Sequence, residues 1–185
     1  MTRILVFANQ EGDTLSSGAK EALAFGSRLA SSTGGEVRSV TLGPFAETGA
    51  REAIASGASI AYTITNPLLA EYDVELFINS IHTVFEQSGA DILILSFDKI
   101  GKDLVGRLAT RSGASAITEV VDYTANSDKL RWIRPIYGDK AFGEYSTTRQ
   151  KAVVGIRQKS QDVKVPDETS KGEIIEVDYA PSEEM

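Results

Sequence analysis

The sequence predicts an α/β protein: a parallel sheet with helices on both faces, plus an antiparallel β extension at residues 115–158. Two observations carry this prediction. Up to Gly113, short apolar runs alternate with segments of helical periodicity, which is the pattern of strand–helix units in a parallel sheet. After Gly113 the helical segments stop, and strand-like runs follow one another with turn residues between them.

Four strand–helix units account for the parallel part. The expected strands cover residues 3–8, 36–43, 59–65 and 91–97, and the expected helices cover residues 15–35, 45–57, 72–89 and 102–113. Ser16 or Ser17 would cap the first helix, because a serine hydroxyl accepts a hydrogen bond from the first turn. Gly34 and Gly35 would end it, because glycine adopts the left-handed conformation of a helix C-terminus without strain.

Four more strand candidates make up the antiparallel extension. They cover residues 115–123, 130–138, 140–148 and 151–158. Residues 126–128 and the pair Gly138-Asp139 supply turn-forming residue types. Pro135 has no backbone N–H to donate, so it predicts that its strand lies at a sheet edge.

Acidic residues gather towards the C-terminal end. Residues 160–185 account for −6 of the net charge of −7. We expect an acidic linker or arm there, with a short strand at residues 173–179. Residues 1–159 form the expected α/β domain, because a chain of 185 residues suits one main core.

Composition excludes several classes of function. The chain has no cysteine and one histidine, His82, which excludes thiolate chemistry and multi-histidine metal sites, so we expect no metal. We expect His82 to be a structural residue of its helix. Residues 1–159 lack the excess of basic over acidic residues that nucleic-acid binding requires. No run approaches the roughly 20 apolar residues that cross a bilayer, so we expect no membrane insertion. The pattern of the first strand begins at residue 3, so we expect no signal peptide and a cytoplasmic protein.

The turn after the fourth strand is a candidate nucleotide site. Gly101 would permit close approach of a phosphate, and the following helix would offer unpaired N–H groups beside Lys102 and Asp103. Asn9 would lie at the same edge if the first and fourth strands are adjacent. The alternative is a structural turn in which Asp103 offsets the helix dipole. Because no Walker or GxGxxG pattern is present, the sequence favours the structural turn.

The segment at residues 131–145 is a candidate partner interface. It combines tryptophan, tyrosine and arginine, the residue types that anchor protein interfaces. We expect Arg134 and Tyr137 to face away from the core, with Lys140 beside them, and a partner to cover this sheet edge. The alternative is a solvated hairpin with no partner.

Three stretches, taken together, resemble the N-terminal domain of the electron transfer flavoprotein alpha subunit. They are the first strand ILVFA, the segment GKDLVGRLATRSGASAITEV, and RPIYGDKAFGEY followed by KAVVGIR. The resemblance covers about residues 3–158 and implies the adenine nucleotide alpha hydrolase-like fold. Lys102 stands where arginine is more usual in the family, and Ser115 and Asp139 stand where glycine is common.

The resemblance implies an electron-transfer role without a catalytic residue in this chain. In the family, FAD is held by a C-terminal domain with a Ser-Gly-Gly-Arg-Gly element, and AMP lies in the beta subunit. Residues 173–185 resemble the arm that connects to that domain, which is absent here, separately encoded or removed. The chain would therefore be a scaffold that pairs with a beta subunit or with itself, and would not bind FAD alone.

Two other functions remain as alternatives. A stand-alone nucleotide-binding domain of the universal-stress-protein type shares the same order of strands and helices. A small hydrolase or transferase is the weaker alternative, because the sequence has no nucleophile elbow and no charge triad.

Overall fold

The computed structural model describes residues 2–126, 129–163 and 165–179, and its centre is a seven-stranded sheet. The strand order is β12 (Glu173–Glu176), β5 (Ile60–Ile64), β4 (Glu36–Leu42), β1 (Arg3–Phe7), β6 (Ile92–Ser96), β11 (Ala152–Ile156) and β7 (Ser115–Val120). Neighbouring strands in this sheet pair in parallel throughout. The predicted α/β class with a parallel sheet is confirmed.

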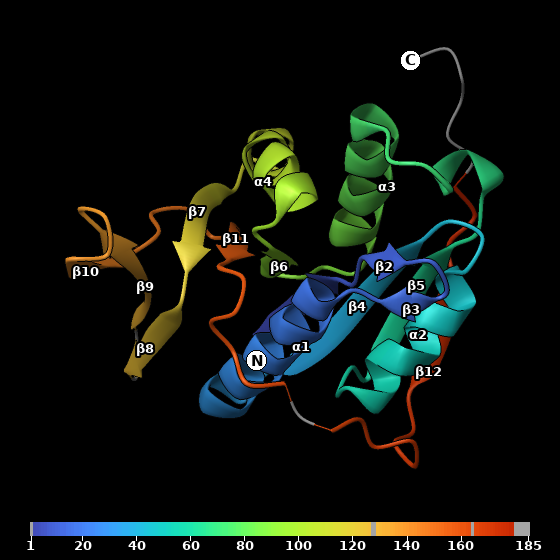
Figure 1. Ribbon diagram of the computed structural model, residues 1–185, viewed down its shortest axis with the longest axis horizontal. Helices are drawn as coiled ribbons and strands as arrows, with labels where there is room; N and C mark the ends of the chain where they lie inside the picture. Colours follow the sequence, from blue (N-terminus) through green and yellow to red (C-terminus); the bar gives the residue numbers. More distant parts are fainter. Residues whose placement is uncertain (1, 127–128, 164, 180–185) are drawn as a thin grey trace.

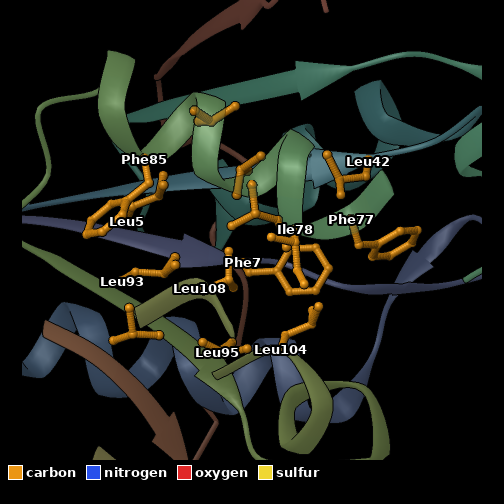
Figure 2. Packing of buried hydrophobic residues seen from close by; sticks show 14 of the residues in the cluster. Leu5, Phe7, Leu42, Phe77, Ile78, Phe85, Leu93, Leu95, Leu104 and Leu108 are labelled. Atoms are coloured by element: carbon orange, nitrogen blue, oxygen red, sulfur yellow. The ribbon is translucent and has the colours of Figure 1, made fainter. Parts of the chain in front are cut away.

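Helices cover both faces of the sheet (Figure 1). Helices α1 (Ser17–Thr33) and α2 (Ala46–Ala55) lie on one face, and α3 (Val74–Gln87) and α4 (Lys99–Arg111) lie on the other. Strand residues alternate between the two cores, so Ile4 and Val6 pack with α1 while Leu5 and Phe7 pack with α3 and α4. Figure 2 shows the second of these cores from close by.

The predicted capping residues of α1 are confirmed, and the helix is two residues shorter at each end than the predicted range 15–35. The Ser16 hydroxyl accepts a hydrogen bond from the Ala19 N–H at 3.1 Å. Gly34 ends the helix with φ 63, the left-handed conformation for which glycine is suited. Helix α4 begins three residues earlier than predicted, because Asp98 caps it and Lys99 is already helical.

The antiparallel extension is shorter than residues 115–158. Of the described strands, β8 (Asp122–Asn126), β9 (Lys129–Ile136) and β10 (Ala141–Tyr145) form this antiparallel sheet, in the order β10-β9-β8. The edge position expected from Pro135 is wrong, because its strand β9 is the central one; Pro135 fits there because it lies beyond Ile133, where the pairing with β8 ends. Residues 115–120 and 152–156 join the parallel sheet instead, with β11 between β6 and β7. Every residue of β11 is buried, as a strand inside a doubly covered parallel sheet requires. The turn expected at residues 126–128 includes positions outside the described residues.

The antiparallel sheet packs on α1 through two aromatic contacts with Phe25. Trp132 of β9 is 1% exposed and stacks on Phe25, with ring centroids 6.4 Å apart. Tyr123 of β8 meets the edge of the same Phe25 ring at 5.4 Å. These rings attach the small sheet to the main domain, because a short antiparallel ribbon has little stability of its own in water.

The arm, residues 160–179, runs from β11, near one edge of the sheet, to β12 at the opposite edge. After β11, Ser160 donates its backbone N–H to Glu21 of α1, and Gln161 donates to the Val121 carbonyl at 2.7 Å. The chain then pairs as β12 with β5, so the predicted strand within residues 173–179 is confirmed. Val177 enters the core that contains α3. Among the helices that the structure describes, none has the length and apolar character needed to span a bilayer.

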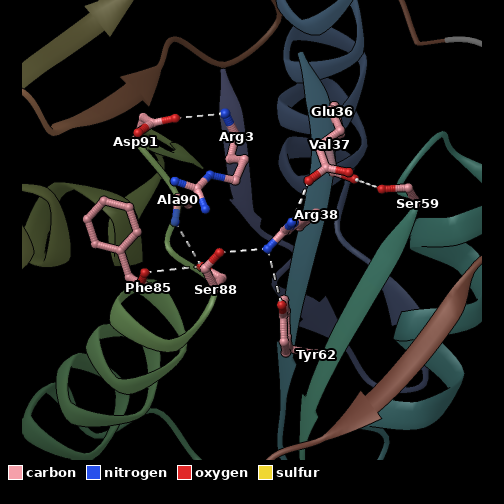
Figure 3. A network of polar contacts seen from close by, with 10 residues as sticks. All are labelled: Arg3, Glu36, Val37, Arg38, Ser59, Tyr62, Phe85, Ser88, Ala90 and Asp91. Atoms are coloured by element: carbon pink, nitrogen blue, oxygen red, sulfur yellow. Dashed lines mark hydrogen bonds and ion pairs between the residues drawn. The ribbon is translucent and has the colours of Figure 1, made fainter. Parts of the chain in front are cut away.

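A polar network fastens the amino ends of the strands (Figure 3). The Arg38 guanidinium donates to the Ser88 carbonyl at 2.6 Å and to Glu36 through Nε at 3.0 Å. The Asp91 carboxylate accepts the backbone N–H of Arg3 at 2.9 Å. This edge is therefore cross-linked by side chains, and the opposite, carboxyl edge is where the loops are free to form a site.

Candidate functional site at the carboxyl edge and the β9–β10 hairpin

The strand order places a switch point between β1 and β6. These strands pair directly, with Ile4 opposite Ile92. From β1 the chain continues to β4 on one side, and from β6 it reaches β11 and β7 on the other. Asn9 follows β1 and Asp98 follows β6, so the structure brings Asn9 and the start of α4 to the same edge, where open parallel sheets usually hold ligands.

The N-terminus of α4 is capped by the chain itself. The Asp98 carboxylate accepts the Gly101 N–H at 2.9 Å. A Cβ atom on Gly101 would lie 1.8 Å from the Ser96 carbonyl oxygen, so the first turn is packed against the end of β6. Helix α1 also approaches the end of β6, because a Cβ atom on Gly18 would lie 2.3 Å from the Ser96 hydroxyl oxygen. Gly101 therefore lies within the helix, and its role is close packing of α4 on the strand.

The other nucleotide candidates have contacts of their own. The Lys102 ammonium lies over the Phe97 ring, 5.7 Å from its centroid. Asp103 accepts the Tyr72 hydroxyl at 2.8 Å and pairs with Arg107 at 3.3 Å. Burial raises the pKa of the Tyr72 hydroxyl above its ordinary value, and the bond to Asp103 raises this pKa further. Asp103 thus links α4 to the start of α3.

Asn9 belongs to the turn before α1. Its backbone carbonyl accepts the Ser16 N–H at 2.9 Å, and the Ser16 side chain caps the helix. This turn contains the small strands β2 (Gln10–Glu11) and β3 (Thr14–Leu15), which pair with each other. The Gln10 side chain donates to the Phe45 carbonyl at 2.9 Å, so the turn is attached to the neighbouring loop.

These residues do not fit the pyrophosphate of FAD. A pyrophosphate is held by unpaired N–H groups at a helix N-terminus. At this edge the Ser16 and Asp98 side chains already accept hydrogen bonds from α1 and α4. The Asp98 carboxylate would also face the anion at the start of α4, which is electrostatically unfavourable. No group of three or more His, Cys, Asp or Glu residues suited to a metal ion forms within the described ranges.

The β9–β10 hairpin presents aromatic and basic side chains to solvent. Tyr137 is 80% exposed at the turn, and Phe142 of β10 is 66% exposed. Lys140 is also exposed. The Arg157 guanidinium donates to both oxygens of Asp139 at 2.6 and 2.9 Å, and this contact holds the pKa of the Asp139 carboxyl below its usual range. Arg157, the residue after β11, therefore fixes the turn, while the rings of Tyr137 and Phe142 stay exposed.

Arg134 differs from the expectation that it faces outward. It is half-buried and donates to the Thr118 hydroxyl of β7 at 3.1 Å. The reason is the strand alternation, since Arg134 shares a face of β9 with buried Trp132. Arg134 therefore holds the hairpin on the parallel sheet, and Tyr137 and Lys140 form the exposed part of the predicted interface.

Two features of the edge were missed in the sequence. The Asp98 cap had a local signal, because aspartate is favoured at a helix N-cap. The contact between Tyr72 and Asp103 had none, since it joins residues of two different helix starts.

The fold and the carboxyl edge together define a parallel α/β domain in which the chain's own side chains cap the two helices at the switch point. The chain belongs to the electron transfer flavoprotein domain family, whose model matches residues 4–182.

Several proteins are similar to this chain. The electron transfer flavoprotein subunit alpha of Bacillus subtilis (strain 168) is 29% identical over 160 residues, 86% of this chain and 49% of that protein. The same subunit of Thermoanaerobacterium thermosaccharolyticum is 27% identical over 178 residues, 95% of this chain and 54% of that protein. Protein FixB of Azorhizobium caulinodans is 30% identical over 140 residues, 73% of this chain and 38% of that protein. The chain thus spans about half the length of the subunit alpha relatives it matches.

The resemblance seen in the sequence is confirmed by this family match. The universal-stress-protein alternative gains no support from it. The matched part of the relatives is their N-terminal region, so their C-terminal half has no counterpart among the residues of this chain.

Proposed function

We propose that this chain is the scaffold domain of an electron transfer flavoprotein of the alpha-subunit type. It assembles with a beta-type subunit, or with a second copy of itself, and acts in the cytoplasm without a catalytic residue of its own. FAD is the cofactor of the complete assembly and is held outside this chain. The observation that carries the proposal is the exposed, aromatic and basic β9–β10 hairpin on a member of this family.

The hairpin has the properties of an assembly surface. Among the strands that the structure describes, β10 pairs with β9 alone, so its other edge offers unpaired backbone groups to a partner strand. Tyr137 and Phe142 supply large exposed rings that a partner would bury. Lys140 supplies a charge that would set the orientation of the partner. Arg134 contributes by holding the hairpin in place through Thr118.

The structural contacts at the switch point between β1 and β6 also support this proposal. The four nucleotide-crevice candidates, Asn9, Gly101, Lys102 and Asp103, have structural contacts, and the α4 N-terminus is capped by Asp98. We infer that this edge serves packing and does not take a nucleotide.

Sedimentation velocity of the purified chain, alone and with the beta-type subunit of the same organism, tests the proposal. We expect a complex, and we expect the double change Tyr137→Ala and Lys140→Ala to weaken it by about 1–4 kcal/mol. The matched control is Phe45→Ala with Arg51→Ala, which removes one aromatic and one basic side chain at the other end of the molecule. A chain that stays monomeric in both samples, or a control that weakens the complex equally, contradicts the assignment of the hairpin.

A further inference from the structure

Strand β12 gives the parallel sheet a short edge that is open on one side. The strand comes from the arm and, among the described strands, pairs with β5 alone. It lies next to α2, at the end of the sheet opposite the β9–β10 hairpin (Figure 1). An edge strand can add a further strand from another molecule, because its outer backbone groups have no neighbour in the sheet.

The hydrogen bonds to β5 show which backbone groups of β12 point outward. The N–H groups of Glu173 and Val177 donate to carbonyl oxygens in and just before β5, at 3.0 and 2.8 Å. Alternate residues of a parallel strand bond to the same neighbour. Ile174 and Glu176 therefore direct their N–H and C=O groups to the open edge, where a further strand could bond to them.

A cavity of about 790 Å³ lies beside the start of β12, between α2 and the arm. Its apolar wall comes from Ile54, Ala55 and Ile174. The Ile174 side chain faces α2, because it packs against Ala50 and Ile54. Gly172 brings the arm close to the helix, since a Cβ atom there would lie 2.9 Å from the Ile54 side chain. A strand added beside β12 would carry side chains on this face, and the cavity has room for a large apolar one.

The open edge is acidic. Exposed acidic residues lie on β12 and close to it in the chain, among them Glu168, Glu173, Glu176 and Asp178. On the rim of the cavity, Lys171 offsets one of these charges, and Arg51 is already paired with Glu47 at 2.6 Å. The surface therefore favours an occupant that places lysine or arginine around one apolar side chain.

The same acidic residues disfavour a second copy of this chain. If two β12 strands paired about a two-fold axis, the glutamates of one strand would face those of the other, and like charges directly opposite are destabilising. A basic strand reverses the effect. Glu173 and Glu176 are three residues apart and lie on opposite faces of β12, so such a strand is attracted on both faces.

We infer that the open edge of β12 binds an extended, basic segment of a partner protein, which adds a strand to the parallel sheet. The segment bonds through its backbone to Ile174 and Glu176. One of its apolar side chains fills the cavity between α2 and the arm, and its flanking lysine or arginine side chains meet the acidic residues. This site is separate from the β9–β10 hairpin and does not depend on the proposed function.

A designed peptide tests the inference on the full chain. The probe is acetylated and amidated, and it has a central leucine between alternating lysine and valine residues. Hydrogen exchange of single backbone amides is followed by NMR. At a peptide concentration of about ten times Kd, exchange at Ile174 and Glu176 should slow about tenfold, because the bound strand accepts hydrogen bonds from these N–H groups. The amides of β10, the edge strand of the hairpin, should exchange at unchanged rates.

Matched changes separate strand addition from attraction between charges alone. Replacing the leucine of the peptide by alanine should weaken binding about tenfold or more, because the cavity loses its apolar occupant. N-methylation of the central peptide nitrogens, which keeps every charge, should abolish the protection. Glu176→Lys should weaken binding roughly five- to tenfold. Glu144→Lys, the same change at an exposed position of edge strand β10, should leave the binding unchanged.

Several outcomes would overturn the inference. They are unchanged exchange at Ile174 and Glu176, equal protection by the N-methylated peptide, equal affinity of the leucine and alanine peptides, and equal weakening by Glu176→Lys and Glu144→Lys. Slow exchange at Ile174 and Glu176 in the concentrated chain without peptide, together with a dimer in sedimentation, would identify a second copy as the occupant and would also overturn it.

Discussion

Gly101 and Gly106 lie in the same helix, α4, and have opposite surroundings. A Cβ atom on Gly101 would lie 1.8 Å from the Ser96 carbonyl, whereas one on Gly106 would meet nothing within 4 Å. We expect Gly101→Ala to lower the free energy of unfolding by about 1–3 kcal/mol or more, because the helix must move off the strand. The matched change Gly106→Ala should raise it by about 0.4–1 kcal/mol, because it restricts the unfolded chain. Urea unfolding of the two variants measures both effects, and similar midpoints would contradict the close packing.

Arg134 and Tyr137 are three residues apart, but different effects are expected from their removal. Arg134→Ala removes the hydrogen bond from a charged donor to Thr118, and we expect a loss of about 1.5–3 kcal/mol of unfolding free energy. Tyr137→Ala changes an exposed side chain, and the expected change is within about 0.5 kcal/mol. Thermal unfolding of the isolated chain distinguishes them. An Arg134→Ala variant as stable as Tyr137→Ala would show that the Thr118 contact contributes nothing.

At the scale of elements, His82 links α3 to the end of α4. Its Nδ1 lies 3.0 Å from the Ser112 hydroxyl. Burial lowers the pKa of His82 below its ordinary value of 6.5, and Arg111 and Lys151 lower it further against the opposing effect of Glu86. The unfolded chain therefore binds a proton at a higher pH than the folded chain does. Stability should fall as the pH drops through 6.5 towards the folded pKa, and should be fully present above this window.

Urea unfolding between about pH 5 and pH 8 measures this dependence. His82→Asn removes the titrating ring but retains polar atoms near Ser112, and we expect the part of the slope near pH 6.5 to disappear. If the parent and the variant have the same slope, the pH dependence arises from other groups.

The elements differ in how far the sequence could predict them. The four strand–helix units were predictable because each carries its own periodicity, and the first helix also carries its own caps, Ser16 and Gly34. The location of β11 was not, because its partners β6 and β7 are distant in sequence. The apolar run of β11 did contain a signal for a strand buried on both faces. The side of β9 that faces the core depended on Trp132 meeting α1, a tertiary contact that no local pattern specifies.

The candidate site was likewise predictable only in part from the sequence. Proximity of Asn9 to the start of α4 followed from the parallel-sheet prediction once β1 and β6 were adjacent. The contacts that close the edge depend on single atoms, such as the Asp98 carboxylate on the Gly101 N–H. Such contacts require the three-dimensional arrangement and are not encoded by spacing.

For the whole molecule, we expect no effect of nucleotides on stability. A ligand at 100 times its Kd would add about 2.7 kcal/mol, so millimolar ATP or AMP should leave the melting temperature unchanged if the capped edge binds neither. The purified chain should also show no flavin absorbance. An increase in melting temperature with ATP that Lys102→Ala abolishes would favour the nucleotide-binding alternative.

The insertion of β11 between β6 and β7 determines the order in which the chain can assemble during synthesis. Strand β7 leaves the ribosome before the antiparallel sheet and β11 do, yet among the described strands of the parallel sheet it pairs with β11 alone. Until Ile156 has been made, the backbone N–H and C=O groups on one edge of β6 have no neighbouring strand. Pairing across such long stretches of chain is slow, and an uncovered strand edge in a nascent chain is prone to aggregation. The growing polypeptide should therefore depend on chaperones until its last interior strand is in place.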